Sequence, residues 1–158
     1  MHDTSERLAE RLLSDGQKSL DFFRRLTPNQ WEHVIYTDGA QWQVHQVLAH
    51  FVSSEQANLQ VIEDIVSGGA GAPADFDIKL FNELEVSELS QLSNGILLVK
   101  FEKLRQTTVQ FVLKLNDLDL TRAGRHPFFG IAPVEDIIKL IYRHNQIHLR
   151  DIRRILES

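Results

Sequence analysis

Three histidines are the residues of this chain whose type and spacing could support chemistry. His144 and His148 lie four positions apart, so on a helix their side chains share one face, about one turn apart. A third histidine, His50, lies in a separate apolar segment. Neutral imidazole nitrogens are common ligands of divalent metals, and three of them can form a site that keeps an open position. We therefore interpret His50, His144 and His148 as candidate ligands of one divalent metal.

A structural role is the alternative for each of these histidines. A single buried histidine is more simply explained by a hydrogen bond to an acceptor in the core. An imidazole costs free energy to bury without a partner, so a pair with a third ring available elsewhere favours metal binding. The spacing alone is weak evidence, because His144 is followed by Asn145 and not by the glutamate of the zincin motif.

His45 competes with His50 for the third ligand position. It precedes His50 by five residues, so the two side chains point about 140° apart around a helix and cannot easily face one ion. His50 adjoins Phe51 and follows Val47 by three residues, which places it nearer the apolar face. We therefore expect His50 to be the ligand. Two other histidines fall outside the long helices and are expected at the surface or in loops: His33 and His126.

Apolar residues that recur with a helical period predict four long helices, at approximately residues 4–26, 41–66, 87–115 and 133–156. In the last of them both histidines continue the apolar stripe of Ile137, Ile141 and Ile152, so they should face the core. The third helix is expected to bury one set of residues: Leu89, Ile96, Val99, Leu104, Thr107, Phe111 and Leu115. Short helices are expected at 29–36 and 78–84 and a loop at 116–132, and no segment alternates as a strand does.

These elements predict an all-α four-helix bundle that forms one domain over residues 1–158. With short loops throughout, the second and fourth helices would lie diagonally opposite each other. The link at 67–86 could reach about 60 Å if extended, which exceeds the roughly 39 Å length of a 26-residue helix. A crossover of that reach allows the second helix to lie beside the fourth, which would bring His50 toward His144 and His148. The sequence allows this arrangement without requiring it.

Composition excludes several classes of function. The chain has 158 residues and no cysteine, so it forms no disulfide and has neither a thiolate ligand nor a cysteine nucleophile. Its net charge of −5 disfavours nucleic-acid binding. We expect a cytoplasmic protein without membrane association, because neither a signal peptide nor a long apolar run is evident. The glycine-rich residues 68–71 lack the lysine of a phosphate-binding loop, and no catalytic residue can be assigned.

Seven short segments, spread over nearly the whole chain, form a recognisable series: Trp42-Gln43-Val44, Val47-Leu48-Ala49-His50-Phe51, Phe81-Asn82-Glu83, His126-Pro127-Phe128-Phe129-Gly130, Pro133-Val134-Glu135-Asp136-Ile137-Ile138, His144-Asn145-Gln146-Ile147-His148 and Asp151-Ile152. Their order resembles that of the DinB-like (YfiT-like) family, whose members are regarded as metalloenzymes. The order and spacing of the three segments that contain the candidate ligands are the most specific part of the resemblance.

The resemblance implies an up-down-down-up four-helix bundle with a long crossover between the second and third helices. It also implies a divalent metal, nickel or zinc, held by His50, His144 and His148 with water in the remaining positions. Some relatives use low-molecular-weight thiols, as bacillithiol transferases or as mycothiol-dependent isomerases. Homodimers are common in the family, the substrates are small molecules, and the family name does not imply DNA binding.

A metal-dependent enzyme is the first functional hypothesis, and a thiol-dependent S-transferase is its preferred form. The thiol would have to be a separate cosubstrate, because the chain has no cysteine. A metal lowers the pKa of a bound thiol, so the transfer could proceed without a protein base. The alternatives are a metal-dependent hydrolase, a non-catalytic bundle that binds metal or a small ligand, and a structural protein whose histidines serve hydrogen bonds in the core.

Overall fold

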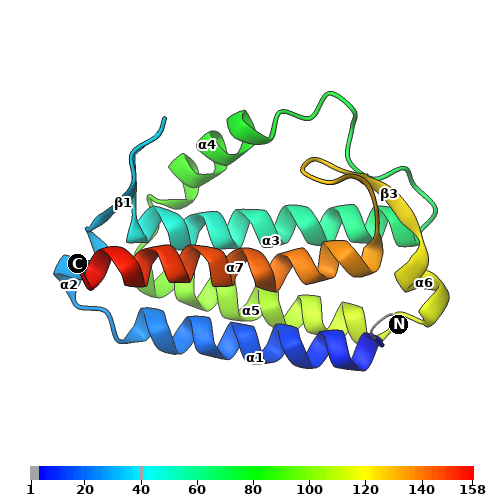
Figure 1. Cartoon of the computed structure of the whole chain (residues 1–158), viewed down its shortest axis with the longest axis horizontal. Helices are drawn as coiled ribbons and strands as arrows, with labels where there is room; N and C mark the ends of the chain where they lie inside the picture. The colour runs from blue at the N-terminus through cyan, green and yellow to red at the C-terminus, as the bar shows by residue number, and fades with distance from the viewer. Residues whose placement is uncertain (1–3, 40) are drawn as a thin grey trace.

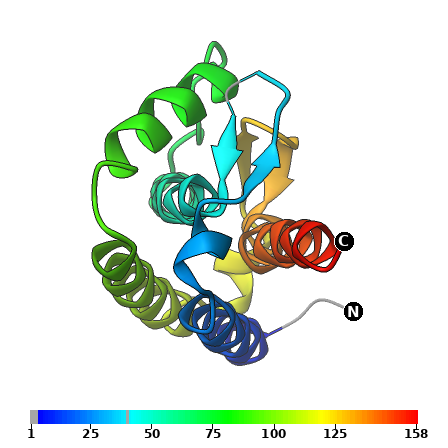
Figure 2. The ribbon, with the colours of Figure 1, turned by 90° about the vertical axis from the view of Figure 1, so that its left-hand side faces the viewer.

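Four long helices form the body of the molecule in the computed structural model, which describes residues 4–39 and 41–158 (Figure 1). They are α1 (Ser5–Arg24), α3 (Val44–Val66), α5 (Asn94–Leu113) and α7 (Val134–Leu156). α1 and α7 run in one direction and α3 and α5 in the other, which gives the up-down-down-up order. Viewed along the bundle, each of α3 and α1 packs against both α5 and α7 (Figure 2). The predicted four-helix bundle with a long crossover is therefore confirmed, and α3 and α7 are neighbours. None of the helices in the described part of the chain combines the length and apolar composition needed to span a membrane.

Short polar side chains set where several helices begin. The Thr4 hydroxyl accepts a hydrogen bond from the backbone N–H of Arg7 and caps α1. The Ser93 hydroxyl accepts from the N–H of Ile96 at 3.2 Å and caps α5. α5 therefore begins at Asn94, later than predicted, and residues 87–89 belong instead to α4 (Ile78–Leu89), which is longer than predicted. The expected start of the third long helix at residue 87 was wrong, because the side chain that caps this helix is that of Ser93.

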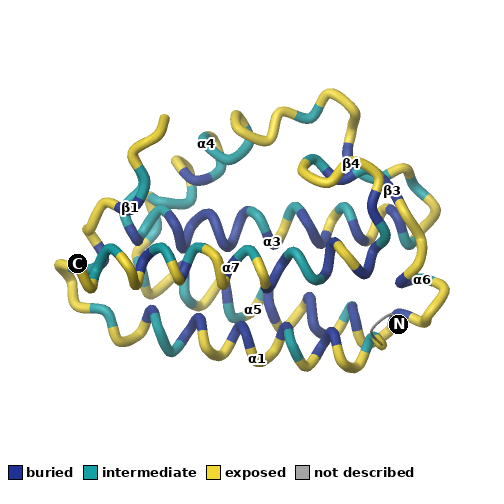
Figure 3. Tube along the Cα trace, viewed as in Figure 1, coloured by how far each residue is buried: buried dark blue, intermediate teal, exposed yellow. Residues whose placement is uncertain are grey.

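The buried face of α5 also differs from the prediction. Ile96 and Val99 are half-exposed, whereas the side chains that point inward include Phe101, Arg105 and Thr108. The apolar period misassigned this face because two of its buried members are polar. The other three long helices bury the faces that their apolar residues predict (Figure 3).

A buried polar network connects all four long helices between two apolar clusters. Arg105 of α5 pairs with Glu55 of α3 at 2.7 Å and with Asp15 of α1 at 3.0 Å. The Thr108 hydroxyl donates to Glu55 at 2.7 Å, and the Asn145 amide of α7 donates to Asp15 at 3.2 Å. Burial lowers the pKa of Arg105, but the two carboxylates outweigh this effect and raise the pKa above its usual range. The network fixes α3 and α7 relative to each other close to the candidate ligands.

Two β-hairpins form where the sequence showed no strand. β1 (Val34–Tyr36) pairs with β2 (Trp42–Gln43), and β3 (Ala123–His126) pairs with β4 (Gly130–Pro133), both antiparallel. The helix expected at 29–36 is only α2 (Pro28–Trp31), and the expected loop at 116–132 contains α6 (Asp117–Thr121) and the second hairpin. Strands of two to four residues are too short to show an alternating pattern.

The crossover from α3 to α5 is tied to the second hairpin. The N–H of Ala72 donates to the carbonyl of Arg125 at 2.7 Å, and the N–H of Arg125 donates to the carbonyl of Ala70 at 2.8 Å. Between them Gly71 has φ +91°, and a Cβ there would collide with the backbone of Arg125, so only glycine fits this approach. The crossover and the hairpin together cover one side of the α3–α7 pair (Figure 1).

Candidate metal centre

The three histidines singled out from the sequence meet where α3 packs against α7. The Nε2 atom of His50 lies 2.9 Å from Nε2 of His144, which lies 2.9 Å from Nε2 of His148. One nitrogen from each ring falls within 4.8 Å of the other two. His50 is buried, and the two α7 rings are partly buried beside it. The crossover thus produces the adjacency that the sequence allowed.

This donor set fits a divalent cation. The Nε2 atom of His144 carries either one proton or one lone pair, so it cannot make two well-directed hydrogen bonds to both neighbours. Two imidazole nitrogens that bind one ion at about 2.0–2.1 Å each lie roughly 3.0–3.4 Å apart, depending on whether they meet it at a right or a tetrahedral angle. The two separations of 2.9 Å lie close to the lower end of that range. Three neutral nitrogens suit zinc or nickel.

Hydrogen bonds outside the cluster determine which nitrogen of His148 carries the proton. The Tyr36 hydroxyl donates its single hydrogen to Asp151 at 2.6 Å, because a carboxylate only accepts. The Nδ1 atom of His148 lies 2.7 Å from the hydroxyl oxygen of Tyr36. Because that hydroxyl has already given its hydrogen to Asp151, Nδ1 must carry a proton and donate to the Tyr36 oxygen. The Nε2 atom of His148 is left with a lone pair that faces the other two histidines. Such a partner orients a metal-binding histidine and raises its basicity.

The role of Tyr36 in this chain of hydrogen bonds was not predicted from the sequence. Tyr36 comes from β1, so the first hairpin supplies a side chain to the site. Burial, together with the hydrogen bond to Asp151, raises the pKa of Tyr36, which keeps its proton at neutral pH. The hydrogen bond from Tyr36 in turn lowers the pKa of Asp151. The only signal in the sequence was the position of Asp151, three residues after His148 and therefore on the same helix face.

All three imidazoles are neutral near pH 7. Burial lowers the pKa of His144 to about 3 and that of His148 to about 4. Burial also takes the pKa of His50 well below its usual value. The ring of Trp42 packs beside His50, with their centroids 4.9 Å apart. Neutral rings present lone pairs, which is the state that binds a metal.

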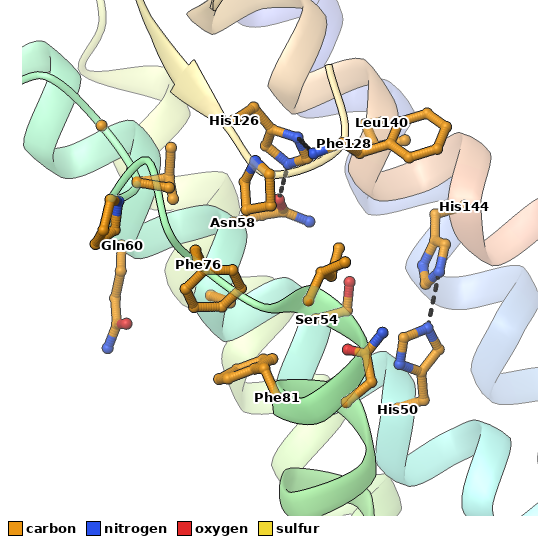
Figure 4. Close-up of a pocket in the computed structure, with 18 of the residues that line it drawn as sticks. His50, Ser54, Asn58, Gln60, Phe76, Phe81, His126, Phe128, Leu140 and His144 are labelled. Carbon is orange, nitrogen blue, oxygen red and sulfur yellow. Dashed lines mark hydrogen bonds between the residues drawn. The ribbon is translucent and has the colours of Figure 1, made fainter. Parts of the chain in front are cut away.

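A mostly apolar cavity of about 520 Å³ opens beside His50 and His144, between α3 and α7 and under the crossover and the second hairpin (Figure 4). Much of its wall is formed by aliphatic and aromatic side chains, among them Val61, Phe76, Phe81, Phe128, Leu140 and Ile147. Asn82 of α4 also lines it. Among the described residues that line it there is no lysine or arginine, and Asp64 is the one carboxylate. This volume and lining are typical of sites for small molecules.

The model of the DinB superfamily matches residues 11–152, which is most of the chain. This chain belongs to the DinB superfamily. A search of curated proteins found no match.

Several solved structures share this DinB fold at low sequence identity. YfiT from Bacillus subtilis, described as a probable metal-dependent hydrolase with an unusual four-helix bundle topology, is 20% identical, with a TM-score of 0.78 over 95% of this chain and 84% of that one. The mycothiol-dependent maleylpyruvate isomerase is 16% identical, with a TM-score of 0.68 over 95% of this chain and 63% of that one. The colibactin self-resistance protein ClbS, solved with double-stranded DNA, is 12% identical, with a TM-score of 0.67 over 95% of each chain. These likenesses establish a common fold.

The other three histidines that the structure describes in this DinB-superfamily chain lie away from the cluster, and His2 lies outside the described residues. His45 contacts Asn94, and its Nε2 lies 2.7 Å from the carbonyl of Ser90, so it faces the junction of α4 and α5. It does not share the cluster with His50, as the helix phase predicted. His33 is exposed, as expected. The expectation that His126 is a surface or loop residue was wrong, since it is 4% exposed at the end of β3 and lines the cavity. Its burial follows from the unpredicted hairpin.

Proposed function

We propose that this chain binds one divalent cation, zinc or nickel, through His50, His144 and His148. The observation that carries the proposal is the convergence of the Nε2 atoms of three neutral imidazoles, of which the His144 atom lies 2.9 Å from each of the other two. The Tyr36–Asp151 pair supports it, because it leaves the lone pair of His148 Nε2 facing the cluster. Among the described residues, the Nε2 atoms of the three rings have no hydrogen-bond partner outside the cluster.

We further propose that the protein is an enzyme that transfers a low-molecular-weight thiol to a small, largely apolar electrophile. A divalent cation with open positions would lower the pKa of a thiol or a water molecule placed there. The chain supplies the rest: His148 is oriented by Tyr36, and the apolar wall of the cavity excludes water and holds the electrophile. Sulfur forms a bond to carbon, the bond to the leaving group breaks, and the thiol proton passes to solvent.

The carboxylates near the cluster already accept hydrogen bonds from other groups, so none is free to act as a general base for water, which favours a thiol as the nucleophile. Glu55 follows His50 along α3, but its carboxylate accepts hydrogen bonds from Arg105 and Thr108. Asp151 accepts hydrogen bonds from Tyr36 and Arg154. A thiol with a lowered pKa loses its proton to solvent near pH 7 and needs no protein base. Hydrolysis is the second candidate, because YfiT, which shares the fold, is described as a probable metal-dependent hydrolase.

Two measurements test the proposal. Elemental analysis of protein purified without a histidine tag should give about one zinc or nickel per chain, and His144→Ala should abolish it while His45→Ala retains it. An unchanged metal content in His144→Ala would overturn the site. Turnover of a chromogenic aryl halide should then require both the metal and an added thiol such as bacillithiol or mycothiol. Turnover with water alone would replace the transferase by the hydrolase.

We also propose that the protein forms a homodimer, as is common in the family. Light scattering, which measures the molar mass in solution, tests this proposal.

A further inference from the structure

Asn58 is a buried polar residue in the apolar cavity, and its surroundings determine how its amide is turned. It lies on α3 eight residues after His50, about 12 Å further along the helix axis. Its side chain lines the cavity, yet the residue is only 8% exposed. The amide oxygen lies 2.7 Å from Nε2 of His126. Which atoms of Asn58 face the cavity depends on which nitrogen of His126 carries the proton.

The turn of the second hairpin fixes the proton of His126. Its Nδ1 atom lies 3.0 Å from the backbone nitrogen of Phe128 and 3.3 Å from that of Phe129. Backbone N–H groups only donate, so Nδ1 must be the acceptor of both. Burial lowers the pKa of His126, which keeps the ring neutral. A neutral imidazole has one N–H, and here it must be at Nε2.

The amide of Asn58 is therefore fixed with its NH₂ group toward the cavity. The Nε2–H of His126 donates to the Asn58 oxygen, and a turned amide would place two donors against each other. Figure 4 shows the amide nitrogen of Asn58 directed away from His126, toward the open space between α3 and α7. That nitrogen has no hydrogen-bond partner among the described residues. A donor pair with no partner in an apolar wall is a binding group for an acceptor atom of a ligand.

We infer that Asn58 binds a carbonyl-type oxygen of a neutral, largely apolar substrate. The described lining holds no lysine or arginine to balance an anion, and the carboxylate of Asp64 disfavours one. Aliphatic and aromatic side chains such as Val61 and Phe76 surround the rest of the molecule. The inference names a substrate class for the proposed enzyme and so rests on that function, but Asn58 binds its acceptor with or without the cation. His126 is a positioning residue that keeps the Asn58 donors aimed at the ligand.

The test compares two probes of nearly equal shape, 1-tetralone and tetralin, which differ by one carbonyl oxygen. The ratio of their dissociation constants is measured by calorimetry for the unchanged protein and for Asn58→Asp. That variant keeps an acceptor for His126 and loses the donors, so the preference for the ketone should fall about three- to tenfold. Ser54→Ala, which changes another residue of the cavity wall, should leave the ratio unchanged. An equal ratio in Asn58→Asp and the unchanged protein would overturn the inference.

Two further measurements cover variants that fail to fold and separate this inference from the proposed function. In the unchanged protein, the side-chain amide NMR signal of Asn58 should shift further with 1-tetralone than with tetralin. Equal shifts would overturn the inference without any mutation. The binding ratio is also measured after chelation, and it should persist. A preference that disappears with the metal would place the ketone at the cation instead, which overturns the role of Asn58 while it supports the metal site.

Discussion

His50 and His144 bring their Nε2 atoms within 2.9 Å of each other although 94 positions separate them in the sequence. The two rings come from antiparallel neighbours, α3 and α7, and both are largely withdrawn from water. The contact therefore joins the two helices that form the walls of the cavity. A ligand that binds both rings stabilises the folded protein relative to the unfolded chain, in which the rings are far apart.

Removal of the metal should accordingly lower the thermal stability of the protein. A ligand at one hundred times its dissociation constant contributes about 2.7 kcal/mol to the free energy of unfolding. We expect a chelator to lower the Tm and added zinc or nickel to restore it, as followed by scanning calorimetry. In His144→Ala the Tm should no longer respond to metal, whereas in His45→Ala it should. Identical Tm values for the unchanged protein with and without chelator would contradict the proposed site.

The phenol of Tyr36 should affect metal affinity through His148. Tyr36→Phe removes the acceptor of the His148 Nδ1–H, and loss of such a partner typically weakens metal binding about 10- to 100-fold. Competition with a chromogenic chelator measures the affinity. Tyr142→Phe is a matched control, because the Tyr142 hydroxyl accepts from Arg11 and makes no hydrogen bond to the cluster. Equal affinities in the two variants would show that Tyr36 does not orient the ligand.

The arrangement of the candidate ligands was largely predictable, because it depends on long-range features that the sequence displays. The stripe that places His144 and His148 on one face of α7 spans most of that helix, and the length of the crossover permitted His50 to approach them. The contribution of Tyr36 was not predictable, because a three-residue strand leaves no periodic signal. The burial of His126 depends on a second short hairpin in the same way.

The buried face of α5 was not predictable either, for a different reason. Apolar periodicity assumes that charged residues face water, and Arg105 violates that assumption by pairing with Glu55 and Asp15 in the core. Ile96 and Val99 were consequently placed inside although they are half-exposed. The burial of Arg105 depends on acceptors that are distant in the sequence, namely the carboxylates of Glu55 and Asp15 and the carbonyl of Leu12.

Replacement of Arg105 by methionine should strongly destabilise the fold. The change leaves the carboxylates of Glu55 and Asp15 buried without their cation, and breaking a buried ion pair in this way costs about 3–5 kcal/mol. Urea unfolding measures the loss. Arg24→Met is the matched control, since the pair of Arg24 with Glu102 is exposed and such pairs contribute about 0–1 kcal/mol. A loss from Arg105→Met as small as that of the control would contradict a structural role for the network.

His126 should make the protein less stable as the pH falls. Burial holds its pKa in the folded protein below the usual 6.5, so the unfolded chain takes up the proton first. The stability that depends on the neutral ring is complete above about pH 6.5 and is lost as the pH falls toward the folded pKa. Protonation would also place an N–H on Nδ1, where the N–H groups of Phe128 and Phe129 point.

The variant His126→Gln removes this titration, so its free energy of unfolding should decline less between pH 7 and pH 5 than that of the unchanged protein. Both are measured by urea unfolding with chelator present, so that the other buried histidines contribute equally. His33→Gln, a change of an exposed histidine, should keep the decline of the unchanged protein. An equal decline in His126→Gln would show that the ring of His126 is not held neutral by its contacts.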